Sequence, residues 1–451
     1  MRLRFDRGTL LFDGAISHQA MIALPGVRWD ARVGAYRAPA HRRREILECC
    51  RDGGVRISDA LSGFRPPPGR FSALPLRPYQ SAALRAWRLA DRRGIVVLPT
   101  GSGKTRVALA ALHELRVATL CLVPTRVLLE QWYRALSQIY DGQVGRLGDG
   151  ERTLRPITVS TFESAYRRMP DMGDRFELLV VDEAHHFGGN TRDDALQMCV
   201  AGARLGLTAT PEHGAANRGL TRLIGPIVYE QRVQDLVGRY LADFDQRVIN
   251  VELTPQERRR YDEDWERFRR VFRPFMWEHP GAGWTDFHRS ASQTEQGRQG
   301  LEAWRRARRL LAYPQGKAEA LDRLLRRHRD ARLLVFTADN ETAYAIARRH
   351  LIMPITCDIG RPEREEVLHW FRQGELRALV SARVLNEGLD VPDADVAIVV
   401  GGTRGQREHV QRIGRVLRPA PGKHARVYEL VVLESREEAV AHQRREGLVS
   451  R

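Results

Sequence analysis

The stretch GIVVLPTGSGKT, residues 94–105, decides the fold of this chain. It opens with an apolar run typical of a buried strand, and a helical pattern follows its last residues. The glycines at 101 and 103 let backbone N–H groups turn inward, where the amino end of the following helix favours bound phosphate. A strand, a glycine loop and a helix in this order predict a nucleotide-binding α/β domain.

The same loop predicts which side chains would hold ATP and Mg²⁺, the cofactors we expect. Lys104 would reach the β- and γ-phosphates, and the Thr105 hydroxyl would ligate magnesium. The remaining loop positions are Thr100, Gly101, Ser102 and Gly103. The general phosphate-loop pattern has glycine where this chain has Leu98, so the match is to the TGSGKT variant. The alternative, a chance GKT, leaves the flanking strand and helix unexplained.

Two adjacent carboxylates end another buried apolar run, FELLVVDE at 176–183. Ligands bind where strands leave a doubly wound sheet at its carboxyl edge. We expect Asp182 to hold the magnesium and Glu183 to orient and deprotonate the attacking water. An acidic helix start would account for one carboxylate. It would not account for the pair together with a phosphate loop.

A third candidate group lies near the carboxyl end, in QRIGRVLRP at 411–419. Gln411, Arg415 and Arg418 have the 4 and 3 spacing of one helix face. Guanidinium groups stay ionised and bind phosphate oxygens in pairs, so Arg415 and Arg418 are candidate arginine fingers for the γ-phosphate. The alternative is a solvated helix face, the usual setting of such arginines.

Further apolar runs of strand length indicate two parallel-sheet domains. They occupy 94–100, 119–125, 157–161, 176–183 and 204–210, and then 332–340, 353–360, 376–384, 396–402 and 425–432. From the amino end we expect a small α+β domain (1–65), a Pro/Gly linker (66–75), a first α/β domain (76–225), the start of a second (226–253), a basic helical insertion (254–312) and the remainder of the second (313–451).

The insertion carries an aromatic stripe. Its members are spaced 4, 3, 4 and 3 apart, on one helix face: Tyr261, Trp265, Phe268, Phe272 and Phe275. We interpret the stripe as a face that packs onto the protein, because amphipathic helices usually bury such a face. Stacking on nucleic-acid bases is the alternative.

Charge points to a polyanionic partner. Lys and Arg number 73 against 56 Asp and Glu, a formal net charge of +17. DNA is therefore the first partner to test. The alternative is a protein that uses arginine freely and has the same composition, but whose basic surface binds no nucleic acid. The first residues lack a signal-peptide pattern, and no run of about 18 apolar residues follows. We expect no membrane and a cytoplasmic location, on the nucleoid in a prokaryotic cell.

Taken in order, these motifs resemble those of superfamily 2 helicases over nearly all of 76–432. They are LRPYQ, TGSGKT, VPTRVLLEQW, TVSTFES, DEAH, TAT, VFTADN, VSARVLNEGLDVPDAD and QRIGRVLRP. The resemblance implies two RecA-like domains that share one ATP site. It also implies site residues: Arg77 and Gln80 at the adenine, Gly388 and Asp390 at the interdomain ATP cleft, Thr208–Thr210 in coupling hydrolysis to movement, and Thr125, Thr161, Thr337 and Arg383 at the nucleic-acid backbone.

Within that superfamily the chain is most similar to the XPB (xeroderma pigmentosum group B) type in its compact archaeal and bacterial form. The stretch LPGVRWDARVGAYRAPAHRR at 24–43 resembles that family's damage-recognition domain, and 254–312 resembles its thumb. The resemblance implies a three-prime to five-prime DNA helicase or translocase of nucleotide-excision-type repair. Its substrate would be single-stranded, forked or damaged DNA, and a nuclease can be its companion.

One stretch departs from the family pattern. XPB-type proteins carry an Arg-Glu-Asp loop soon after TAT, whereas this chain reads PEHGAANRG at 211–219. We therefore expect ATP-driven translocation and leave strand separation open. A duplex translocase that does not separate strands is one alternative. A damage-binding recruitment module that ATP merely switches is another.

Overall fold

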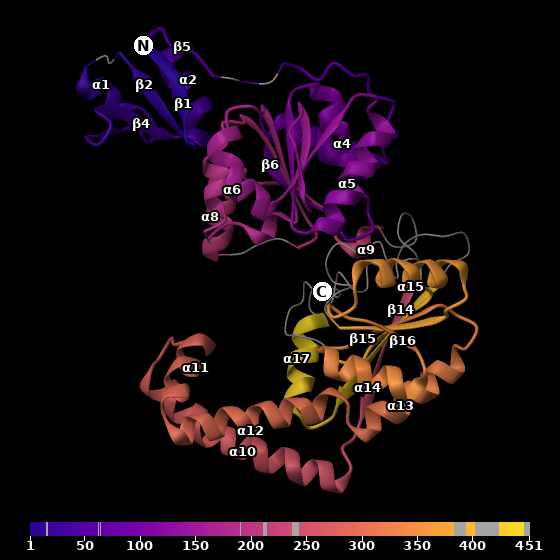
Figure 1. Cartoon of the computed structure of the whole chain (residues 1–451). Coiled ribbons are helices and arrows are strands. Elements are labelled where there is room, and N and C mark those ends of the chain that lie inside the picture. Colours follow the sequence, from indigo (N-terminus) through magenta and orange to yellow (C-terminus); the bar gives the residue numbers. More distant parts are fainter. Residues whose placement is uncertain are drawn as a thin grey trace. The chain divides into compact units, whose positions relative to one another are not determined.

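The computed structural model describes residues 1–14, 17–61, 63, 65–189, 191–210, 214–236, 243–382, 394–401 and 424–445. The chain divides into two compact units, Met1–Leu236 and Val237–Arg451, which are drawn in one colour ramp in Figure 1. The first unit holds a small amino-terminal domain and a large parallel-sheet domain. The second holds another parallel-sheet domain and the helical insertion.

The amino-terminal domain is a five-stranded sheet with strand order β3-β4-β2-β1-β5. Its elements are β1 (Arg2–Asp6), β2 (Thr9–Asp13), α1 (His18–Ala23), β3 (Arg28–Asp30), β4 (Ala35–Pro39), η1 (Ala40–Arg42), α2 (Arg43–Asp52) and β5 (Ser58–Asp59). Arg7 and Gly8 join β1 to β2 with positive φ at both positions, as a tight hairpin turn requires. The core includes Leu3, Leu10 and Ile46, all fully buried.

The large sheet of the first unit has strand order β13-β6-β12-β11-β7-β10-β8-β9. The strands are β6 (Arg93–Val97), β7 (Thr119–Val123), β8 (Val144–Gly148), β9 (Glu151–Thr153), β10 (Ile157–Thr161), β11 (Leu178–Asp182), β12 (Ala203–Thr208) and β13 (Ile227–Glu230). Only the β8–β9 pair is antiparallel among these described strands. Strands β7, β10 and β11 are buried along their whole length, and their sequences are accordingly rich in apolar and β-branched residues.

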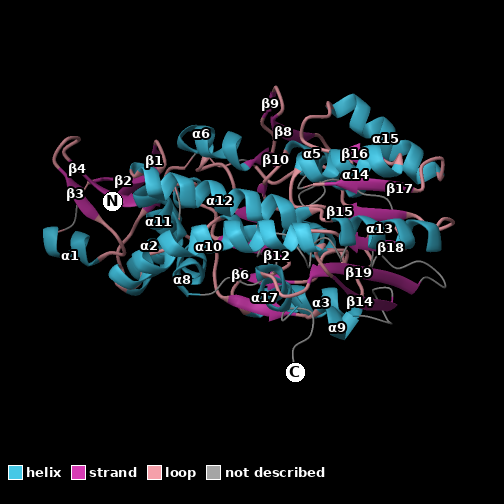
Figure 2. Cartoon of the chain, turned by 90° about the horizontal axis from the view of Figure 1, so that it is seen from below, coloured by secondary structure: helices cyan, strands magenta, loops and turns pink. Residues whose placement is uncertain are grey.

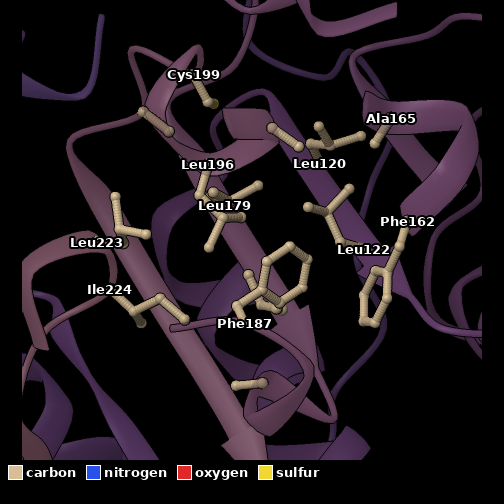
Figure 3. Close-up of a cluster of buried hydrophobic side chains, with 14 of the residues drawn as sticks. Leu120, Leu122, Phe162, Ala165, Leu179, Phe187, Leu196, Cys199, Leu223 and Ile224 are labelled. Carbon is tan, nitrogen blue, oxygen red and sulfur yellow. The ribbon is translucent and has the colours of Figure 1, made fainter. Parts of the chain in front are cut away.

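Helices cover both faces of this sheet. They are α3 (Pro78–Leu89), α4 (Lys104–Leu115), α5 (Arg126–Ile139), α6 (Phe162–Met172), η2 (Ala184–His186), α7 (Asp193–Gln197), α8 (Gly214–Leu223) and α9 (Val233–Leu236). In Figure 1, α4 and α5 lie on one side and α6 and α8 on the other. Figure 3 shows the core on the latter side, where Leu120, Leu122 and Leu179 meet Phe162 and Leu223.

The start of the second domain requires a correction. We predicted it at residue 226, but β13 pairs in parallel with β6 and so completes the first sheet. The first unit accordingly extends to Leu236. The short strand β13 is only partly buried, so it lacks the apolar run by which the other strands were recognised.

The second unit contains a six-stranded, wholly parallel sheet of order β14-β19-β18-β15-β17-β16. Its strands are β14 (Asp243–Val251), β15 (Leu333–Phe336), β16 (Met353–Ile355), β17 (Ala378–Ser381), β18 (Val396–Val399) and β19 (His424–Val432). The helices around it are α13 (Gln315–Arg327), α14 (Asn340–His350), α15 (Arg361–Gln373) and α17 (Arg436–Arg445). Residues of α13 and α14 share one core with the strands, and α15 lies on the opposite side of the sheet (Figure 1).

The insertion is helical throughout, as predicted: α10 (Pro255–Glu278), α11 (Trp284–Gln293) and α12 (Glu295–Ala312). Helices α10 and α12 run side by side (Figure 2). Tyr261 joins the core of the sheet domain, whereas Phe268 lies fully buried among α10, α11 and α12. Phe272 and Phe275 contact Phe287 of α11 at ring separations of 4.9 and 5.4 Å. The stripe therefore packs onto the protein, as we interpreted it.

Candidate active site

The phosphate loop lies between the carboxyl end of β6 and the amino end of α4. Gly101 and Gly103 have φ of 83° and 80°, in the left-handed region that favours glycine. Gly103 is the N-cap residue directly before α4, so the first free N–H groups of the helix face the loop. The glycine loop predicted from the sequence therefore has the backbone that a phosphate cradle needs.

Side chains of α3 form hydrogen bonds to the backbone of this loop. Tyr79 Oη donates to the Ser102 carbonyl at 2.5 Å, and Gln80 Nε2 donates to the same oxygen at 2.9 Å. Gln80 Oε1 in turn accepts from the Arg77 N–H at 2.9 Å. A Cβ at Gly103 would lie 2.7 Å from Gln80 Nε2, so no larger residue fits there while Gln80 keeps its place. Arg77 and Gln80, the predicted adenine residues, thus lie beside the loop.

The residues of the loop fit a chain of phosphates. The half-buried Lys104 lies over the loop, with Nζ 3.2 Å from the Leu98 carbonyl and 3.5 Å from that of Pro99. Thr105 follows in the first turn of α4. The buried Thr100 Oγ1 has no hydrogen-bond partner in the described part of the chain. One ammonium, free helix N–H groups and hydroxyls are the donors that phosphate and its magnesium require.

Asp182 ends β11 and is 6% exposed. Trp132 Nε1 of α5 donates to its Oδ2 at 2.8 Å, and the N–H of Glu183 donates to its Oδ1 at 3.0 Å. Burial raises the pKa of Asp182, while the charge of Lys104 and these two hydrogen bonds act in the opposite direction. The carboxylate is therefore fixed in place and kept available as a ligand for a cation near Lys104.

Glu183 begins a polar chain that leads to the TAT segment. Its backbone has φ of 50°, a strained conformation for a non-glycine residue. His185 Nδ1 lies 3.4 Å from Glu183 Oε2 and 3.0 Å from Thr208 Oγ1. Because the Thr208 hydroxyl donates to the Thr210 carbonyl at 2.9 Å, it accepts from His185, which requires the tautomer with hydrogen on Nδ1. The Glu183 carboxylate thus lies beside the hydrogen bonds that connect His185 to Thr208 and Thr208 to Thr210.

Sheet order explains why these groups meet. Strands β6, β12 and β11 are neighbours and parallel, so the loop that follows β6, the TAT segment and Asp182 all lie at one carboxyl edge. The same edge continues through β7, which ends two residues before Thr125, and through β10, which ends at Thr161. Both threonines cap helices: their Oγ1 atoms accept from Leu128 N–H and Ser164 N–H.

The second unit provides fewer of the predicted site residues. Thr337 follows β15 and is fully buried, and its hydroxyl donates to the Asp339 carbonyl at 2.9 Å. Six predicted positions lie outside the described residues: Arg383, Gly388, Asp390, Gln411, Arg415 and Arg418. Their roles stay predictions.

Sequence reasoning did not assign roles to Tyr79, Trp132 or His185. Each lies within a motif that the sequence displays, in LRPYQ, VPTRVLLEQW and DEAH. Position within a motif was thus a usable signal. The partners of these side chains, however, are 23, 50 and 23 residues away along the chain and appear only once the sheet is formed.

Three family models match the chain in succession. The xeroderma pigmentosum group B helicase damage recognition domain matches residues 3–61, the type III restriction enzyme res subunit matches 73–213, and the helicase conserved C-terminal domain matches 316–420. The DNA 3'-5' translocase XPB2 of Sulfurisphaera tokodaii is 36% identical over 450 residues, which cover 98% of this chain and 99% of the relative. The chain belongs to the XPB family of helicases.

Other relatives of this XPB-family chain are longer. The DNA 3'-5' helicase XPB of Kineococcus radiotolerans is 29% identical over 392 residues, 83% of this chain and 62% of the relative. The Pyrococcus furiosus Hef helicase domain is similar in structure, with a TM-score of 0.51, 19% identity and coverage of 81% of this chain and 97% of that one. Together with the two matched helicase domains, this likeness confirms the predicted fold, two tandem RecA-like domains of the superfamily 2 helicase type.

With both helicase domains present, this XPB-family chain is an enzyme, a DNA-dependent ATPase of the helicase class. In the described part of the chain, no helix combines the length and the apolar character that crossing a membrane demands.

Proposed function

We propose that this chain is an ATP-driven DNA helicase or translocase that moves three-prime to five-prime and acts in nucleotide-excision-type repair. The observation that carries the proposal is the single sheet edge on which Lys104, Asp182 and the Glu183–His185–Thr208 chain converge. The polarity is supported by the similarity to XPB2 of S. tokodaii, whose name gives that direction. The companion nuclease and a cytoplasmic, nucleoid-associated location rest on the family resemblance alone.

In this proposal, bound Mg²⁺ would neutralise phosphate charge and polarise the bond to be broken. Thr105 and Asp182 would hold it, Lys104 would bind the β- and γ-phosphates, and Arg77 and Gln80 would bind the adenine. Glu183 would take a proton from the attacking water. Because His185 lies between Glu183 and Thr208, a change at the carboxylate would reach the TAT segment through this imidazole. Gln411, Arg415 and Arg418 would complete the site from the second domain.

The duplex translocase is the second candidate. The Arg-Glu-Asp tripeptide is missing from 211–219, and Arg218 lies exposed on α8. The similarity over nearly the whole chain is, moreover, to a protein named a translocase. Residues 211–213 lie outside the described part of the chain, so the sequence alone supports this candidate there.

One set of substrates tests both candidates. Single-stranded oligonucleotides with streptavidin at the 5′ or the 3′ end report polarity, and a three-prime to five-prime motor clears the 5′ end faster. Triplex displacement reports movement on duplex DNA, and a forked duplex reports strand separation. We expect triplex displacement with ATP. Streptavidin cleared faster from the 3′ end would overturn the polarity, and no ATP-dependent displacement from any substrate would overturn the motor.

A further inference from the structure

A pocket of about 720 Å³ opens within the first unit, away from the phosphate loop. It is formed by the amino-terminal domain together with α7 and α8 of the sheet domain. Its volume lies within the roughly 300–1,000 Å³ typical of sites for small ligands. We call it the Trp29 pocket. The side chains that matter to the argument are Arg28, Trp29, Arg32, Arg37, Arg42 and Arg222.

The Trp29 pocket keeps an excess of positive charge, although Arg37 also pairs with Asp6 and Arg42 pairs with Glu45 beside it. Asp30 is the one carboxylate among the five arginines that line it. It accepts from Arg32 at 3.0 Å and from Arg37 at 3.3 Å, so it holds two guanidinium groups in place. Neither Arg28 nor Arg222 has a carboxylate partner among the residues that the structure describes. An anion with several oxygens matches this arrangement, because guanidinium groups bind phosphate in pairs.

Trp29 adds an aromatic surface to the rim. Its side chain lies on β3 at the edge of the sheet and is 51% exposed. The Tyr36 ring contacts it edge-on, at 4.9 Å and an interplanar angle of 69°. Such a contact fixes the orientation of the indole without covering it from both sides. An exposed, oriented indole beside phosphate-binding groups is what a stacked base requires.

His41 lines the same pocket and is 5% exposed. Neither of its ring nitrogens forms a hydrogen bond of acceptable geometry with any described residue. Burial is the main cause that lowers the pKa of His41, to about 3. The positive charges of Arg204 and Arg42 lower this pKa further, and the backbone of Gln197 raises it. The imidazole is therefore neutral near pH 7. A neutral ring offers one donor and one acceptor, which a base edge or a sugar hydroxyl can use.

The pocket also joins the two domains of the first unit. Arg44 pairs with Asp91 and donates to its carbonyl at 2.9 Å, and a Cβ at Gly8 would overlap the Met198 side chain. These contacts hold the amino-terminal domain against the sheet domain. Arg222 belongs to α8, the first described helix after the TAT segment. A ligand that binds the arginines of both domains would therefore contact the motor directly.

We propose that the Trp29 pocket binds one unpaired nucleotide of DNA, with its phosphates among the arginines and its base against Trp29. Arginines alone would also attract an acidic peptide. The exposed indole and the neutral imidazole favour a nucleotide, because a nucleotide offers a phosphate and a flat ring together, whereas a peptide of Asp and Glu offers no ring to stack. Most of the pocket lies in the domain matched by the damage recognition model, so the proposal deepens that similarity by naming the ligand and the residues that bind it. The site is separate from the ATP site, so it stands or falls independently of the proposed motor function.

The test compares two labelled duplexes that differ by a single bulged nucleotide. Affinity of the full chain is measured by fluorescence anisotropy without ATP, at one fixed salt concentration. We expect wild type to prefer the bulged duplex, and Trp29→Ala to lose roughly tenfold in affinity for it and little for the paired duplex. Trp29→Phe should keep most of the preference. Arg222→Ala should weaken binding and lower the salt dependence by about one phosphate contact.

Tyr166→Ala is the matched control, because Tyr166 is an exposed aromatic residue on α6, outside the pocket. It should leave the preference unchanged. Basal ATP hydrolysis, measured on every variant, separates a misfolded chain from a chain that has lost only the pocket. Wild type that binds both duplexes equally would overturn the proposal. So would a Trp29→Ala variant with an undiminished preference, or an acidic peptide that competes at the pocket while bulge binding is unaffected.

Discussion

At the scale of single residues, the phosphate loop depends on one cation. Lys104 Nζ lies 3.2 Å from the Leu98 carbonyl and contributes favourably to the ionised form of Asp182. The same ammonium group therefore donates to the loop backbone and favours the ionised form of Asp182. The neighbouring Ser102 serves a different purpose, because its hydroxyl donates to Pro99 O at 2.6 Å and stiffens the turn.

Lys104→Ala should reduce ATP turnover at least about a hundredfold, the size of effect expected when one group that stabilises transition-state charge is removed. DNA binding without ATP should persist. Steady-state phosphate release and DNA anisotropy measure the two quantities. Arg85→Ala, an exposed arginine on α3, is the control. Normal turnover in Lys104→Ala would show that the loop is not the hydrolytic site.

Trp132→Phe should lower kcat roughly 10- to 100-fold, because it removes a hydrogen bond to an ionised acceptor. The lost N–H favoured the charged form of Asp182, so the pKa of Asp182 should rise and the acid limb of the ATPase pH profile should move to higher pH. The matched control is Trp87→Phe. Trp87 is equally buried but donates to the Arg204 carbonyl, away from the site. A profile displaced equally in both variants would make the role of Trp132 merely structural.

At the scale of elements, long buried strands were predictable and short edge strands were not. Runs of apolar and β-branched residues identified β6, β7, β10, β11 and β12, because strands buried on both faces carry few solvated positions. In contrast, β13 was assigned to the wrong domain, since its pairing with β6 is decided by tertiary contact. The loop, the carboxylates and their common edge followed from the sequence, whereas the partners of Trp132 and His185 did not.

Thr208→Val should uncouple movement from hydrolysis. It keeps the shape of the side chain and removes the hydroxyl that connects His185 to Thr210. We expect basal hydrolysis to stay within a few fold of wild type while triplex displacement per ATP hydrolysed falls. Thr158→Val, a buried threonine of β10 in the same sheet, is the control. An unchanged ratio of displacement to hydrolysis would contradict the coupling role.

Phe268→Ala should destabilise the insertion by about 3–5 kcal/mol, as expected for the loss of a fully buried aromatic side chain. Phe268 contacts the rings of Phe272, Phe287 and Trp304, so its loss affects all three helices. Hydrogen exchange should accelerate in α10, α11 and α12, with little change in β15 and β18. Uniform acceleration through the sheet would show that the insertion is not a separate packing unit.

At the scale of the whole molecule, a basic chain carries the nucleotide site and the candidate backbone contacts on one sheet edge. The net charge of +17 favours DNA over an acidic protein surface. From β6 to β10, the edge runs from the phosphate loop to the helix-capping threonines Thr125 and Thr161. Events at the nucleotide can therefore reach a bound strand through neighbouring strands of one rigid sheet.

The most direct test is steady-state ATP hydrolysis by the full chain without nucleic acid, with single-stranded DNA, with duplex DNA and with RNA, at one salt concentration. We expect DNA to stimulate turnover severalfold or more and the Lys104→Ala variant to remain inactive throughout. Turnover that no nucleic acid changes, in a chain that still binds DNA, would contradict the motor. It would favour instead a DNA-damage-binding recruitment module whose conformation ATP merely switches.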